Sequence, residues 1–212
     1  MQIIIKFMKK RVFLFLITIA LTAVSTSVNA QNAAKARQVL DKTSALIMGK
    51  GGATANFTLS GNGIGSTSGT VSVKGNKFYA STPNIKVWNN GKTQWTYTRS
   101  TNEVTVSKPN DAQQMTANPY KFITIYKSGY ALSLKETGGQ YEIHLKAIHP
   151  GRSIQEAFIN ISHSYYPTKV RMRQGKKWAT ITISGLRTRN IPNSSFEFNK
   201  KAYPNAEIVD LR

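Results

Sequence analysis

Cysteine is absent from this 212-residue chain, and acidic side chains are few. Without thiols the chain can form no disulfide framework and no thiolate metal site, and it offers no cysteine for lipid modification or nucleophilic catalysis. Asp and Glu number 9 against 29 Lys and Arg, which gives a formal net charge of +20 at pH 7. An excess of this size predicts attraction to an anionic partner such as nucleic acid, a phospholipid surface or an acidic protein.

Catalytic and metal-binding patterns are also missing from the sequence. The three histidines, at 144, 149 and 163, are never two or four residues apart, so no single element presents a pair of metal ligands. The glycine-rich run 61–69 has Thr67 where a nucleophile elbow carries serine, and no helical pattern follows it as a phosphate loop requires. We therefore expect a protein that is not an enzyme, with no catalytic residues, no metal site and no cofactor.

The first thirty residues have the pattern of a secretory signal peptide. Basic residues at 6, 9, 10 and 11 precede an apolar run, 12–24, that is short for a membrane span and so disfavours a membrane anchor. The run leads to Val28-Asn29-Ala30, and we expect cleavage after Ala30. A start at Met8 instead of Met1 would give the same signal without its first seven residues.

The predicted organisation is a signal peptide at 1–30 and one domain at 31–212, located in the periplasm. Residues 1–30 hold four basic and no acidic side chains, so the remaining chain keeps a net charge of +16. Export argues against nucleic acid as the anionic partner and favours a membrane surface or an acidic envelope protein.

The remaining sequence changes its periodicity once. Residues 32–48 carry apolar side chains at helical spacing, which predicts one amphipathic helix. Glycines at 49, 51 and 52 end that pattern, and from Ala53 onward apolar and polar side chains alternate with a period of two. Turn residues separate the alternating segments at short intervals, so we expect about eleven antiparallel strands connected as a meander.

Two segments, 111–129 and the tail, depart from the regular alternation of the other strands. In 111–129 the alternation stops, and Asn118-Pro119 predicts the start of a short helix. The tail alternates again at Phe196 and Phe198 and ends with the apolar pair Ile208-Val209. A sheet with so many strands must protect its edges, which favours a sandwich or a strongly curved sheet covered by the helix. The space between sheet and helix is either a packed core or a cavity, and the sequence leaves both open.

The stretch 69–106 carries a recognisable motif. A pair of strands marked by Pro83 leads to the hairpin Gly91-Lys92-x-x-Trp95-x-Tyr97. This arrangement resembles the periplasmic lipoprotein carrier (LolA-like) family. Further landmarks of that family follow in the same order: Asn118-Pro119 before a short helix, a strand at 196–198 and the segment 206–210.

The resemblance implies a mostly β fold with helices, an unclosed antiparallel β-barrel covered by a helical lid. It implies an apolar cavity that takes the acyl chains of lipoproteins and carries them through the periplasm from the inner to the outer membrane. The implied partners are those acyl chains, an inner-membrane release complex, an outer-membrane receptor and, transiently, an anionic membrane surface. Nucleic acid is not among them, and we expect a monomer.

The sequence departs from that family at one position. The family commonly has an Arg-Pro pair after the strand equivalent to 71–74, and its arginine ties the lid to the sheet, whereas here Gly75-Asn76 follow. Lys74 or Lys77 is the available substitute, but neither offers the planar fork that makes bidentate hydrogen bonds. We expect the lid to hinge at 49–52 and 111–117.

We assign the lining of the cavity to apolar residues of the lid and the sheet. From the lid these are Val39, Leu46, Ile47, Phe122 and Ile125, and from the sheet Phe57, Leu59, Val71, Phe78, Trp95 and Tyr97. The alternative for each residue is that it fills the core.

Two other functions remain open for this sequence. One is a carrier of another amphiphile, such as a glycolipid, and the other is a structural envelope protein with a filled core. A basic stripe at Lys169, Arg171 and Arg173 alternates with Val170 and Met172 and therefore lies on one outer face. That stripe either brings the protein to anionic headgroups or is an ordinary solvated surface.

Overall fold

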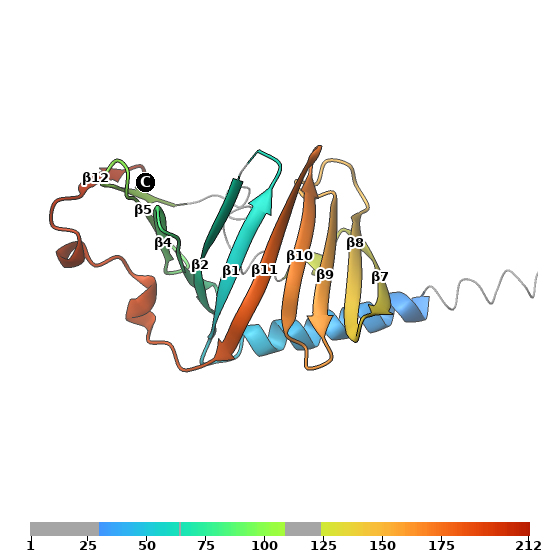
Figure 1. Ribbon diagram of the computed structural model, residues 1–212. Coiled ribbons are helices and arrows are strands. Elements are labelled where there is room, and N and C mark those ends of the chain that lie inside the picture. Colours follow the sequence, from blue (N-terminus) through green and yellow to red (C-terminus); the bar gives the residue numbers. More distant parts are fainter. Residues whose placement is uncertain (1–29, 64, 109–123) are drawn as a thin grey trace, which may run out of the picture.

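The computed structural model describes residues 30–63, 65–108 and 124–212. In this part of the chain, twelve strands form one open sheet in the order β12-β6-β5-β4-β3-β2-β1-β11-β10-β9-β8-β7 (Figure 1). The strands of the first half are β1 (Ala53–Gly61), β2 (Gly65–Lys74), β3 (Lys77–Ser81), β4 (Ile85–Asn89), β5 (Gln94–Thr98) and β6 (Glu103–Ser107). Those of the second half are β7 (Tyr130–Thr137), β8 (Gln140–Ala147), β9 (Glu156–Ser162), β10 (Pro167–Gln174), β11 (Lys177–Thr188) and β12 (Glu207–Asp210). The prediction of a mostly β fold built on an unclosed sheet is confirmed.

The sheet consists of two meanders joined in the middle. Strands β1 to β6 follow one another as antiparallel neighbours, and β7 to β11 do the same. The two meanders meet where β11 pairs antiparallel with β1. Strand β2 begins at Gly65, so most of the glycine-rich run 61–69 lies in β2.

The last strand is the exception to antiparallel pairing. β12 runs parallel to β6, from Glu207 beside Glu103 to Asp210 beside Val106. This is possible because residues 189–206 form a long connection in place of a tight turn. The predicted strand at Phe196 and Phe198 is wrong. Here the chain forms two 3-10 helices, η2 (Asn193–Phe196) and η3 (Lys200–Ala202), and packs against the sheet instead of pairing with it.

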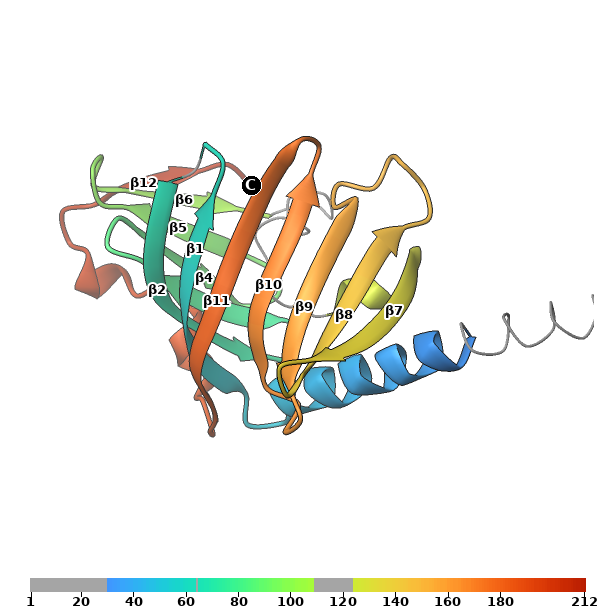
Figure 2. The same ribbon diagram turned by 45° about the vertical axis from the view of Figure 1, so that its right-hand side comes forward.

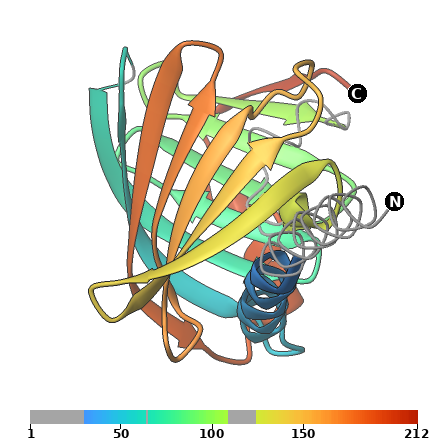
Figure 3. The same cartoon turned by 90° about the vertical axis from the view of Figure 1, so that its right-hand side faces the viewer.

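A single long helix, residues 30–47, covers one face of the sheet. Figure 3 shows the sheet curling so that this helix lies along its open side. The face of the sheet that the helix contacts is called the concave face below, and the other the convex face. Ala36, Val39 and Leu40 bury their side chains here against strands β7 to β10, with exposures of 0%, 4% and 4%.

A bulge in β11 keeps its apolar residues on the concave face. Between Thr54 and Asn56 of β1 the pairing shifts, and Gly185 of β11 has a φ of +60°, which only glycine adopts without strain. The extra residue lets Ile183 and Leu186, three positions apart, both pack into the apolar clusters on the concave face.

The helix also protects one edge of the sheet. The side chain of Asn32 accepts a hydrogen bond from the backbone N–H of Leu134 (2.6 Å) and donates one to the carbonyl of the same residue (2.8 Å). Leu134 lies in β7, the last strand of the sheet, whose outer backbone groups have no neighbouring strand. The amide thus occupies part of the edge that another chain would otherwise pair with.

Replacing Asn32 with Ala should remove both hydrogen bonds and lower the free energy of unfolding by about 1–3 kcal/mol. Urea unfolding followed by circular dichroism measures this loss. Hydrogen exchange at the amide of Leu134 should accelerate in the same variant, because that N–H loses its acceptor. Asn62→Ala is the control, since Asn62 is exposed in the turn after β1. An unchanged exchange rate at Leu134 would show that the amide contact contributes nothing.

Candidate functional site

The centre of the concave face carries apolar side chains that are only partly buried. Phe57 and Leu59 of β1 lie opposite Ile183 and Ile181 of β11, and all four remain partly accessible to solvent. Val71 of β2 pairs with Ala55 of β1 and is also partly exposed. These strands form the middle of the sheet, so a greasy surface lies at the centre of its concave side.

Two buried clusters flank that central surface. The larger one joins the first half of the helix to the strands of the second meander: Ala36, Val39, Leu40, Ile125, Tyr126, Tyr130, Leu134, Ile143, Leu145, Ile154, Ala157, Ile159, Ile161 and Val170. The smaller one joins the end of the helix to the first meander through Ile47, Ala53, Val73 and Phe78. Packing is therefore tight under the helix and looser between the clusters.

The ring of Phe57 has room on the concave face because its neighbour is a glycine. Gly69 lies opposite Phe57 in β2, and a methyl group there would come within 3.0 Å of the ring atom Cζ. The same methyl group would clash with the backbone oxygen of Ser81 in β3. Gly69 thus permits a close approach of β3 and lets an aromatic ring lie over the strand, as in the pairing of edge glycines with aromatic residues.

The residues predicted from the lid lie near this surface, with one exception that the structure does not describe. Val39 and Ile125 belong to the larger cluster, Ile47 to the smaller one, and Leu46 packs against the smaller one while partly exposed. Phe122 lies outside the described residues, as do the predicted hinge at 111–117 and the helix start at Asn118-Pro119. Phe78 is 1% exposed and fills the smaller cluster.

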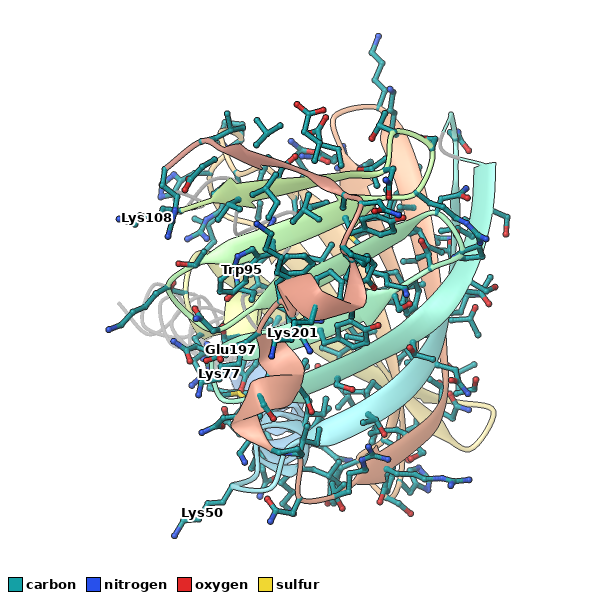
Figure 4. All side chains as sticks on the ribbon, turned by 90° about the vertical axis from the view of Figure 1, so that its left-hand side faces the viewer. Lys50, Lys77, Trp95, Lys108, Glu197 and Lys201 are labelled. Atoms are coloured by element: carbon teal, nitrogen blue, oxygen red, sulfur yellow. The ribbon has the colours of Figure 1, made fainter. Side chains whose placement is uncertain are left out.

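Trp95 and Tyr97 do not lie with the other predicted lining residues. The pairing places Val71 opposite Ala80, Ala80 opposite Val87, and Val87 opposite Thr96, so Thr96 shares the concave face. Its neighbours in β5, Trp95 and Tyr97, therefore point to the convex face. Figure 4 shows Trp95 on that outer side, next to the C-terminal segment that carries Lys201.

An aromatic cluster holds the C-terminal segment on the convex face. Trp88 of β4 contacts Phe198 and Tyr203 with ring centroids 5.5 and 5.7 Å apart, and Tyr97 contacts Tyr203 at 4.6 Å. Lys86 donates a hydrogen bond to the hydroxyl of Tyr203 at 3.0 Å. The aromatic residues of β4 and β5 therefore pack against the C-terminal segment 189–206. This explains why these strands have an apolar face that points away from the helix.

The concave face also carries apolar residues that were not predicted to line a cavity. Ile181 and Ile183 pack beside the larger cluster together with Met172 of β10. Val87 and Ala80 pack beside the smaller one. The alternation of apolar residues in 178–184 and 170–172 is the signal that could have identified Ile181, Ile183 and Met172.

Polar contacts fasten the helix to the second meander. Tyr126 donates a hydrogen bond to the carboxylate of Asp41 at 2.6 Å, and burial, together with that carboxylate, raises the pKa of the tyrosine well above its usual value. Lys42 donates to the hydroxyl of Tyr165 at 2.9 Å. The backbone of Tyr165 has a φ of +64°, a strained conformation that costs about 1–3 kcal/mol. Lys35 pairs with Glu136 at 2.9 Å in solvent.

Among the described residues, no hydrogen bond or ion pair joins the helix to Lys74 or Lys77, the lysines proposed as replacements for the family's arginine. Lys74 donates a hydrogen bond to the carbonyl oxygen of Ile191 at 2.6 Å and thus holds the C-terminal segment. Lys77 lies opposite Lys74 across the β2–β3 turn, and its side chain forms no hydrogen bond or ion pair with the described residues. The lid is held by the tyrosine, lysine and asparagine contacts instead.

Two hydroxyls of the helix are buried, those of Thr43 and Ser44, and that of Ser44 donates a hydrogen bond to the sulfur of Met48. Thr43 is 5% exposed, and its Oγ1 forms no hydrogen bond within the described part of the chain. A buried hydroxyl without a partner costs about 1–3 kcal/mol.

Thr43→Val should therefore stabilise the fold by about 1 kcal/mol, because valine has the same shape and a similar helix propensity. Urea unfolding measures the change. Thr70→Val, at an exposed position of β2, controls for the gain from an added methyl group. Destabilisation by Thr43→Val would mean that the hydroxyl has a partner in solution.

Residues 30–63, 65–108 and 124–212 contain no group of three or more His, Asp and Glu side chains that could hold a metal ion. His144 forms a pair with Glu156, at 2.8 Å, on the convex face. No described helix combines the length and the apolar character needed to span a bilayer.

A family model and several solved structures match this chain. Residues 26–176 match the family model described as outer membrane lipoprotein carrier protein LolA. No curated protein matches the chain. Among solved structures, an uncharacterised conserved protein from Thermus thermophilus is 13% identical, with a TM-score of 0.55, covering 83% of this chain and 99% of its own. This likeness supports the fold.

Two further solved structures are more distant. A LolA superfamily protein from Nitrosomonas europaea is 11% identical with a TM-score of 0.42, and the alignment covers 77% of this chain and 97% of that one. The lipoprotein LppX of Mycobacterium tuberculosis is 15% identical with a TM-score of 0.43, again covering 77% of this chain and 97% of that one.

Proposed function

Because this chain belongs to the LolA family of outer membrane lipoprotein carriers, we propose that it binds lipoprotein acyl chains on its concave face and carries them across the periplasm. The family is one of carriers and not of enzymes, and it functions outside the cytoplasm. The observation that supports the proposal is the partly exposed apolar surface around Phe57, Leu59, Ile181 and Ile183 between two buried clusters.

The energetics of acyl binding suit such a surface. Each CH₂ group removed from water contributes about 0.8 kcal/mol, so one chain of sixteen carbons gains about 12 kcal/mol when fully buried. Lipoproteins carry several chains and do not cross water unaided. A carrier must also release them, and a surface that covers its guest incompletely binds it below this full value.

Movement of the helix would adjust how much of the guest is covered. The helix is fastened to the second meander by Asn32, Asp41 and Lys42, whereas its end packs on the smaller cluster near Gly51 and Gly52. The backbone of these glycines pairs with Arg189 and Ile191 after β11. If the helix moves away from the sheet, the contacts that break are therefore mainly those of the larger cluster, between the helix and the second meander.

Native mass spectrometry of protein purified from the periplasm tests the proposal directly. We expect bound lipoprotein or acylated peptide. A glycolipid or a free phospholipid as the dominant ligand would replace lipoprotein as the cargo, and a protein that never carries an amphiphile would contradict the proposal.

Phe57→Glu should weaken the binding of a fluorescent fatty acyl probe at least tenfold, because the acyl chain would have to bury a carboxylate. Titration of the probe measures the affinity, and far-UV circular dichroism checks that the strand content is unchanged. The matched control is Asn56→Glu, which adds the same charge one residue away, at an exposed position facing the convex side. If both variants lose binding equally, the concave face is not the site.

A further inference from the structure

One end of the sheet collects three connections between strands. The turn 61–65 joins β1 to β2, the loop 148–155 joins β8 to β9, and the turn 174–177 joins β10 to β11. Gly61 pairs with Ala179, and Glu156 pairs with Arg173. All three connections therefore lie at the same end of the sheet, as Figure 2 shows. This end, with the adjoining outer positions of β8 to β11, is called the rim below.

The rim is strongly basic. Between residues 144 and 178 the only acidic side chain is Glu156. The basic side chains on the rim are Lys146, Arg152, Arg171, Arg173, Lys176 and Lys177. Glu156 is already engaged by His144 at 2.8 Å and by Arg173 at 3.2 Å. Burial opposes the charged form of Glu156, but those two hydrogen bonds outweigh it and keep the pKa of the carboxyl below its usual value.

Most charge on the rim is therefore uncompensated. Lys146, Arg171, Lys176 and Lys177 form no ion pair with the described residues. At the opposite end of the same strands, by contrast, Lys35 pairs with Glu136 and Lys135 with Glu142. The two lysines at the far end of β7 and β8 are thus each paired with a carboxylate, whereas most cations of the rim are not.

Aromatic rings hold one of these cations in place. The guanidinium of Arg171 lies over Phe158 at 5.0 Å and over Trp178 at 4.6 Å from the ring centroids. His144 stacks on the same Phe158 at 4.4 Å with parallel planes. The stacked guanidinium keeps its in-plane N–H donors free, because it forms no hydrogen bond with the described residues. A planar fork of this kind matches a phosphate group.

Apolar side chains accompany these charges. Ile148 in the β8–β9 loop is 60% exposed, and Trp178 is partly exposed at the start of β11. Tryptophan beside basic residues is typical of surfaces at the level of lipid headgroups. The rim also adjoins the partly exposed concave surface, since Leu59 and Ile181 pair two positions from the turn after β1.

We propose that the rim docks the protein on an anionic phospholipid bilayer, with Arg171 donating to a lipid phosphate and Ile148 and Trp178 entering the headgroup layer. Docking in this orientation places the apolar concave surface next to the bilayer from which acyl chains would leave. The purpose of docking rests on the proposed carrier function, but docking is measured without cargo, so the two proposals fail separately.

Sedimentation with lipid vesicles tests the proposal. The protein should bind vesicles that contain phosphatidylglycerol and not vesicles of phosphatidylcholine alone, and binding should fall as salt is raised. The double variant K176Q/K177Q should weaken binding by about 20-fold, from the contribution of each basic residue near an anionic surface. Its matched control is R187Q/R189Q, which removes two exposed charges at the far end of β11, about 30 Å away at 3.3 Å per residue. The control should change binding less than threefold.

A charge-conserving variant separates phosphate recognition from general attraction. R171K keeps the charge but loses the stacked fork, and we expect a loss of about fivefold, comparable to removing one contact. Ile148→Ser should also weaken binding without changing its salt dependence. Equal effects of the rim pair and the R187Q/R189Q pair would overturn the proposal. So would absence of vesicle binding at every phosphatidylglycerol content, as expected if the rim instead recognises an acidic protein.

Discussion

The length of one helix limits how this sheet is covered. Eighteen residues of α-helix, 30–47, span about 27 Å, whereas twelve strands side by side extend over about 50 Å. The helix buries the concave face of the second meander and, at its end, the first strands of the other. The outermost strands of the first meander bury their convex face instead, under the C-terminal segment. The partly exposed surface of β1 and β11 lies between the region covered by the helix and the region covered by the C-terminal segment.

The same constraint explains what the sequence could and could not predict. A period of two identifies a strand and its apolar face, and the alternation that begins at Ala53 does coincide with the start of β1. It does not say on which side of the sheet that face lies. Trp95 and Tyr97 belong to strands whose apolar side faces away from the helix, so assigning them to the concave surface was wrong. Only the register from β2 across to β5 decides the question.

The tail shows a related limit. Phe196 and Phe198 alternate like strand residues, yet both anchor a connection to the sheet: Phe198 contacts the rings of Trp88 and Tyr203, and Phe196 is fully buried in η2, which packs against β3 and β4. The family resemblance named the same strand at 196–198 and was equally wrong there, but it was informative at the Gly91 to Tyr97 hairpin, which the structure contains as β4–β5. It was less informative about the lid contacts, because Asn32, Lys42 and Asp41 occupy positions that no family motif marks.

The junction of β1 and β11 also governs how the chain can reach this structure. Within each meander, paired strands are close in sequence. The pair Ala53 and Thr188, which joins the two meanders, is separated by 135 positions in the sequence. Closing so long a loop is entropically costly, and topologies rich in such contacts fold slowly. We therefore expect the two meanders to form first, as separate cooperative units, and the central seam with its partly exposed apolar surface to close after them.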